Sequence, residues 1–175
     1  MKILLSVLVC LAMLLNTGCS DDTHSAHETI IARQNDTEEG LFYGELNNVM
    51  RNVFFDFIVT DPQRLTEKGG YRASEGYQLL CVTIEERNTF GETLPMFLAD
   101  YQIQWGEGDS DFANPLTGLQ DEQVMPDSFE LNPDETVVYQ VVFEVPQDIT
   151  EFELVYLEEF ADETVGDLFI VRFQV

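Results

Sequence analysis

Residues 139–146 read YQVVFEVP, and this stretch decides the fold. Its apolar side chains stand at every second position, at Tyr139, Val141, Phe143 and Val145, and Pro146 ends the run. Successive side chains of a β-strand point to opposite faces of a sheet. The alternation therefore predicts a strand that buries one face.

The same period of two recurs along most of the chain from residue 41 onward. Turn residues such as those of Asn132-Pro133-Asp134 separate the runs, and Asp61-Pro62 is expected to end the first of them. No window of a dozen residues places apolar side chains at helical spacing between caps. The other runs are residues 53–60, 80–85, 101–105, 152–156 and 169–175.

About seven such strands predict an all-β fold in which two antiparallel sheets pack face to face. The best match is an immunoglobulin-like β-sandwich, formed by residues 41–175 as one domain. Two long connections, residues 62–75 and 106–129, account for a length beyond the usual 100 or so residues of that fold.

The N-terminus has the features of a secretory signal peptide, residues 1–18. A short apolar run, residues 3–15, follows Met1-Lys2 and is shorter than the roughly 20 residues that cross a bilayer as a helix. Residues 14–22 resemble the cleavage region of a bacterial lipoprotein precursor, which implies acylation of Cys19. Asn16 departs from that pattern, which prefers Leu there, and ordinary cleavage near Gly18 without lipidation is the alternative.

Residues 19–40 are expected to form a lipidated N-terminus and a flexible tether. The segment is polar, has no sustained period and contains both histidines, His24 and His27. Cys10 would leave with the signal peptide, so Cys81 alone remains in the domain and no internal disulfide is expected. Cys81 lies in an apolar run without an adjacent cation or base, which favours a packed thiol over a reactive one.

The charge of the chain is strongly negative, with 8 Lys+Arg against 33 Asp+Glu and a formal net charge of −25. Nucleic-acid binding is excluded, because it requires cationic side chains opposite the phosphates. A hydrophobic content of 45% is too high for a disordered acidic chain. The charge either keeps the domain soluble and away from anionic lipid and wall polymers, or steers a cationic partner toward it. The scarcity of lysine also fits life in high salt.

Neither an enzyme nor a cofactor is expected from the residue types available. A Ser–His or Cys–His pair needs its base held within hydrogen-bond reach, and both histidines precede the first strand. Zinc sites use several Cys or His ligands, of which the domain offers Cys81 alone. A glycosidase pair of carboxylates cannot be recognised from strand spacing.

One acidic segment, Glu107-Gly108-Asp109-Ser110-Asp111, is a candidate calcium site. Its alternating carboxylates Glu107, Asp109 and Asp111 are the hard oxygen ligands that calcium prefers. The segment lacks the later Gly and Glu of the helix–loop–helix calcium motif. The alternative is a solvated surface loop.

Several blocks of the domain combine strand and turn residues in a distinctive series. They are residues 76–84 (GYQLLCVTI), 88–90 (NTF), 95–97 (PMF), 104–106 (QWG), 131–135 (LNPDE) and 141–146 (VVFEVP). This series resembles a bacterial family of uncharacterised extracellular lipoproteins, which share the immunoglobulin-like fold of secreted immunoprotective antigens. The resemblance covers roughly residues 40–175 and implies an extracytoplasmic lipoprotein with no established activity and no catalytic residues.

These observations predict a binding or accessory module on the extracytoplasmic face of a bacterial cell membrane. Cys19 would attach it to the membrane, and a sheet face or the end loops would contact a protein partner at the cell surface. Phe112 and Phe129 are candidate contact residues, since aromatic side chains are enriched at interaction hot spots; packing beneath their own loops is the alternative. A second candidate function is binding of calcium or a small ligand at the acidic loop.

Overall fold

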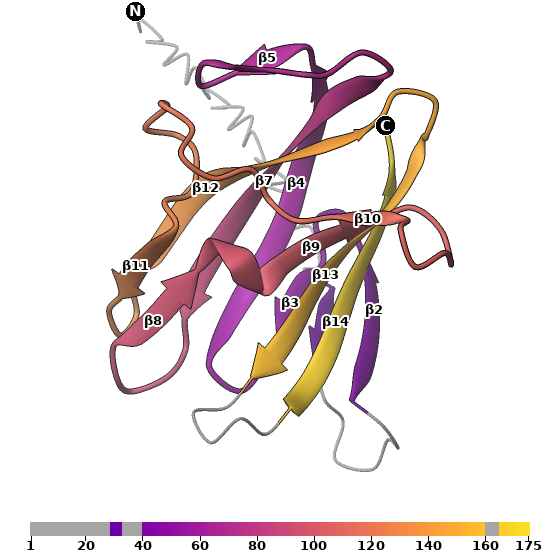
Figure 1. Ribbon diagram of the computed structural model, residues 1–175. Helices are drawn as coiled ribbons and strands as arrows, with labels where there is room; N and C mark the ends of the chain where they lie inside the picture. Colours follow the sequence, from indigo (N-terminus) through magenta and orange to yellow (C-terminus); the bar gives the residue numbers. More distant parts are fainter. Residues whose placement is uncertain (1–28, 33–39, 160–164) are drawn as a thin grey trace, which may run out of the picture.

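The protein is a sandwich of two five-stranded β-sheets, accompanied by two small two-stranded sheets (Figure 1). This computed structural model describes residues 29–32, 40–159 and 165–175, and it confirms the predicted all-β sandwich. The elements are β1 (Ile30–Ala32), β2 (Leu41–Glu45), β3 (Val49–Arg51), β4 (Phe55–Leu65), β5 (Glu67–Lys68), β6 (Tyr71–Arg72), β7 (Tyr77–Asn88), β8 (Leu94–Phe97), the 3-10 helix η1 (Leu98–Asp100), β9 (Tyr101–Gln104), β10 (Phe112–Ala113), β11 (Ser128–Leu131), β12 (Thr136–Pro146), β13 (Glu151–Glu159) and β14 (Val165–Gln174).

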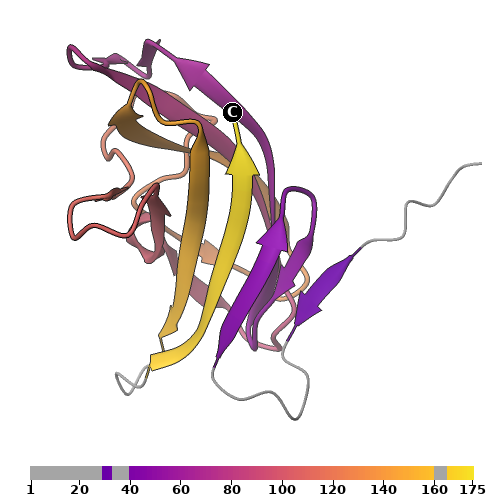
Figure 2. The ribbon, with the colours of Figure 1, turned by 90° about the vertical axis from the view of Figure 1, so that its right-hand side faces the viewer.

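The chain passes repeatedly between the two sheets. One sheet has the order β1-β3-β4-β7-β12, and the other has the order β10-β9-β13-β14-β2. From β2 onward the chain crosses between them after β2, after β7, after β10 and after β12. Most neighbours are antiparallel, but β2 runs parallel to the C-terminal β14. Figure 2 shows the two layers from the side, with β2 next to β14. Sheets that face each other in this way bury alternate residues of each strand.

Aromatic rings fill the space between the sheets. The ring of Phe57 makes edge contacts with Tyr101, Tyr156 and Phe169 at centroid distances of 6.0, 5.6 and 6.1 Å. Phe57 and Tyr101 are each 1% exposed. Edge-to-face pairs of this kind each contribute about 0.5–1.5 kcal/mol beyond burial of their area. The predicted inward positions of the 139–146 run are confirmed at Phe143 and its neighbours on the same face.

Strand β4 differs from the expectation at both ends. Val53 lies outside it and is 52% exposed. The strand begins at Phe55 because the Oδ1 atom of Asn52 accepts the N–H groups of the next residues, at 2.7 Å from Phe54 and 2.8 Å from Phe55. Asp61-Pro62, expected to end the strand, instead forms a bulge where the register with β7 shifts, and pairing continues to Leu65. A bulge accommodates one extra residue without ending the sheet.

The long 106–129 connection covers the edge of the first sheet. Its central part, residues 114–125, is called the strap here. The strap bonds to β12, with Leu116 N–H donating to the Val142 carbonyl at 2.7 Å and Met125 N–H to the Gln140 carbonyl at 2.9 Å. Beneath it a second apolar cluster packs on the outer face of the sheet, with Lys68 and Asp121 paired at 2.8 Å beside it. The buried members of that cluster are Leu79, Cys81, Val124 and Val142.

Part of the predicted tether belongs to the domain. Ile30–Ala32 form β1, which pairs in parallel with Val49–Arg51. The prediction that residues 19–40 form a tether is therefore wrong for these three, whose two isoleucines favour a strand. The predicted signal peptide, Cys19 and both histidines lie outside the described residues. Within the described ranges, no helix is long and apolar enough to cross a membrane.

Candidate functional site

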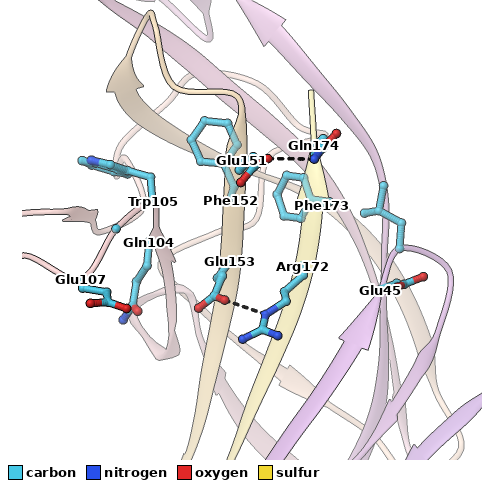
Figure 3. Close-up of a pocket in the computed structure, with 12 residues that line it drawn as sticks. Glu45, Gln104, Trp105, Glu107, Glu151, Phe152, Glu153, Arg172, Phe173 and Gln174 are labelled. Atoms are coloured by element: carbon cyan, nitrogen blue, oxygen red, sulfur yellow. Dashed lines mark hydrogen bonds and ion pairs between the residues drawn. The ribbon is translucent and has the colours of Figure 1, made fainter.

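A groove of about 780 Å³ lies on the sheet formed by β9, β13, β14 and β2, beside the β9–β10 connection (Figure 3). One row of side chains runs across its floor, because Gln104 pairs with Glu153, Glu153 with Arg172, and Arg172 with Glu45. The neighbours of these residues along the strands, such as Leu154 and Val171, point into the core. The row therefore faces outward from the sandwich.

Carboxylates dominate the charge of the groove. Glu45, Glu107, Glu151 and Glu153 line it, against the single cation Arg172. The Arg172 Nε atom donates to Glu153 at 2.7 Å, and this bond raises the pKa of the guanidinium. One negative charge is thus neutralised and three remain. A basic ligand would find partners there without displacing the existing ion pair.

The polar groups of the floor hold one another in position. Gln174 Nε2 donates to Glu151 at 3.0 Å, and Gln104 Nε2 donates to Gln102 at 2.8 Å. The Arg172 guanidinium lies 4.1 Å from the centroid of the Tyr43 ring, on the neighbouring strand β2. This cation–π contact links the charged row to the next row of the sheet.

A tight turn forms the wall of the groove next to Trp105 and Glu107. Trp105 N–H donates to the Asp111 carbonyl at 3.0 Å, and the Asp111 carboxylate accepts the Gly108 N–H at 2.9 Å. Trp105 is half-buried and packs against the main core. The wall is therefore fixed to the sandwich on one side and exposes Glu107 on the other.

The structure does not gather the three candidate calcium ligands. Glu107 lines the groove, Asp109 is exposed in the turn, and Asp111 uses its carboxylate on the Gly108 amide. Among residues 29–32, 40–159 and 165–175, no group of three or more His, Cys, Asp or Glu side chains is placed to hold a metal ion. The geometry thus gives the calcium hypothesis no support, and it stays a prediction.

The two candidate aromatic contacts have different environments. Phe129 of β11 packs its ring against Tyr139 at a centroid distance of 5.2 Å, so the expectation of packing beneath its own segment is confirmed. Phe112 of β10 is 42% exposed and pairs with Gln104. Paired residues share a face, so Phe112 extends the outward row of the groove by one strand. Cys81 is buried under the strap, and burial raises the pKa of its thiol.

A buried acid between the sheets was not anticipated from the sequence. Glu86 of β7 is 1% exposed, and its Oε1 atom accepts a 2.7 Å hydrogen bond from the Tyr101 hydroxyl. Its Oε2 atom has no hydrogen-bond partner among the described residues. Burial raises the pKa of Glu86 to about 7, the Tyr101 bond lowers it, and Asp100 adds a further increase. One signal was available: Glu86 continues the inward series of Leu80, Val82 and Ile84.

Comparisons with known proteins show similarity of fold. Neither the family comparison nor the search of curated proteins gives a match. The "putative lipoprotein (ycdA)" of Bacillus subtilis superposes with a TM-score of 0.59 and 15% identity, over 79% of this chain and 39% of that one. The chain thus corresponds to about two fifths of that protein. The yjhA protein of Bacillus subtilis superposes with a TM-score of 0.54 and 10% identity, over 75% of this chain and 99% of that one.

Proposed function

We propose that the protein is a lipid-anchored extracytoplasmic binding module that holds a protein partner in the groove across β9, β13, β14 and β2. The observation that carries this proposal is the outward row of the groove, with Glu45, Glu107 and Glu151 around the neutralised pair of Glu153 and Arg172. Side chains projecting from four hydrogen-bonded strands form a rigid, preformed contact surface. Exposed Phe112 at one end of the row offers an aromatic contact.

Binding rather than catalysis fits the residues that line the groove. They comprise carboxylates, amides, one arginine and apolar side chains, without Ser, Cys, Lys or His. A Ser or Cys nucleophile paired with a His base is therefore missing from the lining. The carboxylates increase the rate at which a cationic partner arrives, since uncompensated charge of one sign steers an oppositely charged molecule.

The proposed location rests on the lipoprotein-like segment that ends at Cys19, together with the fold likeness to the ycdA protein. Acyl chains contribute about 0.8 kcal/mol per buried methylene, so two or more hold a protein firmly at a bilayer. Cys19→Ala should move the full-length protein from the membrane fraction to the soluble fraction of expressing cells. Cys81→Ala is the matched control and should stay with the membranes. Retention of both variants would contradict anchoring through Cys19.

Capture on intact cells tests the groove as the binding surface. A photo-reactive residue replaces Gln104 in the floor of the groove in one variant, and Val138 of β12 in another. Val138 is 56% exposed on the opposite sheet. The groove probe should attach one protein reproducibly, and the Val138 probe should not.

A variant without the uncompensated carboxylates of the groove tests whether the capture depends on their charge. Glu45→Gln, Glu107→Gln and Glu151→Gln together should abolish the capture from position 104. Neutralising Glu85, Glu122 and Glu130, three exposed acids outside the groove, should leave it unchanged. Equal recovery of the same proteins from positions 104 and 138, or capture that the groove variant does not alter, would overturn the proposed function.

A further inference from the structure

The sheet face that carries the groove changes character along its strands. Next to the charged row lies a row in which Val155 pairs with Ile170 and Ile170 with Tyr43. Beyond it lies a row formed by Leu157, Leu168 and Leu41, by the same register. All of these side chains share the outward face of Glu153, Arg172 and Glu45, because each stands two or four residues from one of these three along its own strand.

Three of these apolar side chains are far more exposed than core residues. Leu41 is 44% exposed, Tyr43 45% and Leu157 40%, whereas the inward-facing Phe169 of β14 is fully buried. Isolated exposed apolar residues are common on protein surfaces. Here, however, they are grouped on one sheet face: Leu41 and Tyr43 lie on β2 and Leu157 on β13, on either side of β14. Between them, Ile170 of β14 is 7% exposed and Leu168 is partly buried. Exposed apolar side chains grouped on one face, unlike scattered ones, mark an interaction site.

The apolar rows and the charged groove form one continuous surface. Tyr43 belongs to the apolar rows and carries the Arg172 guanidinium 4.1 Å from its ring centroid, so the two parts touch. A ligand lying along the strands therefore meets apolar side chains at one end and uncompensated carboxylates at the other.

We infer that the groove binds an amphipathic polypeptide segment whose apolar residues and basic residues are separated into two halves. The apolar half covers Leu41, Tyr43 and Leu157, and the basic half faces Glu45, Glu107 and Glu151. This inference rests on the proposed function and specifies the chemistry of its partner. It differs from charge steering alone, because it requires the two kinds of residue in separate blocks.

Charge complementarity selects this occupant over two others. A second copy of the chain would bring a net charge of −25 against the same sign. A wholly apolar segment would cover the carboxylates of the groove and leave them without counter-ions, which is costly when charges lose their water.

Four synthetic peptides of about twelve residues test the inference with the purified full-length protein. One has a Leu- and Phe-rich half followed by a Lys-rich half, and the second reverses this order. The third has the same composition in scrambled order, and the fourth keeps the lysines but has Ser at the apolar positions. One of the two block peptides should bind at least about tenfold more tightly than the scrambled peptide, because only it buries the apolar rows. Binding of all lysine peptides should weaken between low and high salt.

Variants separate the two halves of the surface. Leu41→Ser with Leu157→Ser should reduce binding of the preferred block peptide to that of the scrambled peptide, and leave the Lys–Ser peptide unchanged. Val138→Ser, at an exposed apolar position of the other sheet, is the control and should have no effect. Circular dichroism and thermal unfolding establish that each variant is folded.

Two results would overturn the inference. If the block and scrambled peptides bind equally and with the same response to salt, the apolar rows take no part, although the groove can still be the binding surface found by capture on cells. If none of the lysine peptides binds, the partner is not basic. The proposed function fails separately, if the probes at positions 104 and 138 capture the same proteins equally or if the groove variant does not alter the capture.

Discussion

Replacing Glu86 with glutamine should make the protein more stable than the wild type at pH 8, by up to about 3 kcal/mol, and should leave it nearly unchanged below pH 4.5. Burial raises the pKa of Glu86 from 4.5 to about 7 in the folded protein. Each unit of difference between the folded and unfolded pKa corresponds to about 1.4 kcal/mol. Glutamine is neutral at every pH and can accept the same hydrogen bond from Tyr101.

The sign of the effect follows from proton linkage. Below pH 4.5 Glu86 is protonated in both the folded and the unfolded chain, so it contributes no penalty. Between pH 4.5 and 7 the unfolded chain releases this proton while the folded protein retains it, and the free energy of unfolding falls as the pH rises. Above pH 7 both states are ionised and the loss is complete. The free energy of unfolding of the wild type therefore falls by this amount between pH 4.5 and 7 because of Glu86, whereas that of Glu86→Gln does not.

Urea unfolding at pH 5, 6, 7 and 8 measures the difference between the two proteins. Comparison at each pH cancels the contribution of the other acids, which both proteins share. Glu85→Gln is the matched control, because Glu85 is exposed on the opposite face of the same strand. If the free energies of unfolding of the wild type and Glu86→Gln change in parallel with pH, Glu86 does not hold a proton at neutral pH.

Asn88→Ala should destabilise the protein by about 3 kcal/mol. The fully buried Asn88 side chain ends β7 and joins it to the small β8–β11 sheet. Its Nδ2 atom donates to the carbonyls of Glu92 at 2.9 Å and Leu131 at 2.8 Å, and its Oδ1 atom accepts the Phe90 N–H at 2.7 Å. A buried group left unpaired costs about 1–3 kcal/mol, and alanine removes all three partners together.

Denaturant unfolding at constant pH tests this value. Asn114→Ala serves as the control, since Asn114 is exposed and accepts a single 3.4 Å hydrogen bond from Gln102. A surface substitution of that kind changes stability by no more than about 0.5 kcal/mol. A loss of stability below about 1 kcal/mol for Asn88→Ala would contradict this prediction. It would mean that the backbone groups that Asn88 bonds find other partners in the variant.

The sandwich could be predicted from the sequence because the pattern that indicates it lies within each strand. Alternation with a period of two specifies which side chains point inward, and it correctly identified Phe57, Phe143 and Val171 as core residues. It failed where a strand is interrupted without ending. Asp61-Pro62 has the composition of a turn, yet the register shift absorbs one residue and β4 continues.

The groove could not be predicted, because its residues come together only through strand pairing. Glu45, Gln104, Glu153 and Arg172 are far apart in sequence and meet by the register of four strands. No spacing along the chain encodes such a row. The acidic segment 107–111 was visible locally, but of its three carboxylates Glu107 alone lines the groove.

The strap has a consequence for the protein at high concentration. β12 is an outer strand of 11 residues, and an uncovered strand of that length offers its backbone as a template for pairing with neighbouring molecules. In the middle of β12, the backbone groups of Gln140 and Val142 are already bonded to those of Leu116, Gln123 and Met125. The strap therefore hinders pairing of this edge with the edge of a neighbouring molecule, which is the first step of fibrillar aggregation. Other β-proteins protect their edges with charged side chains, above all lysine, and this lysine-poor chain uses a covering segment instead.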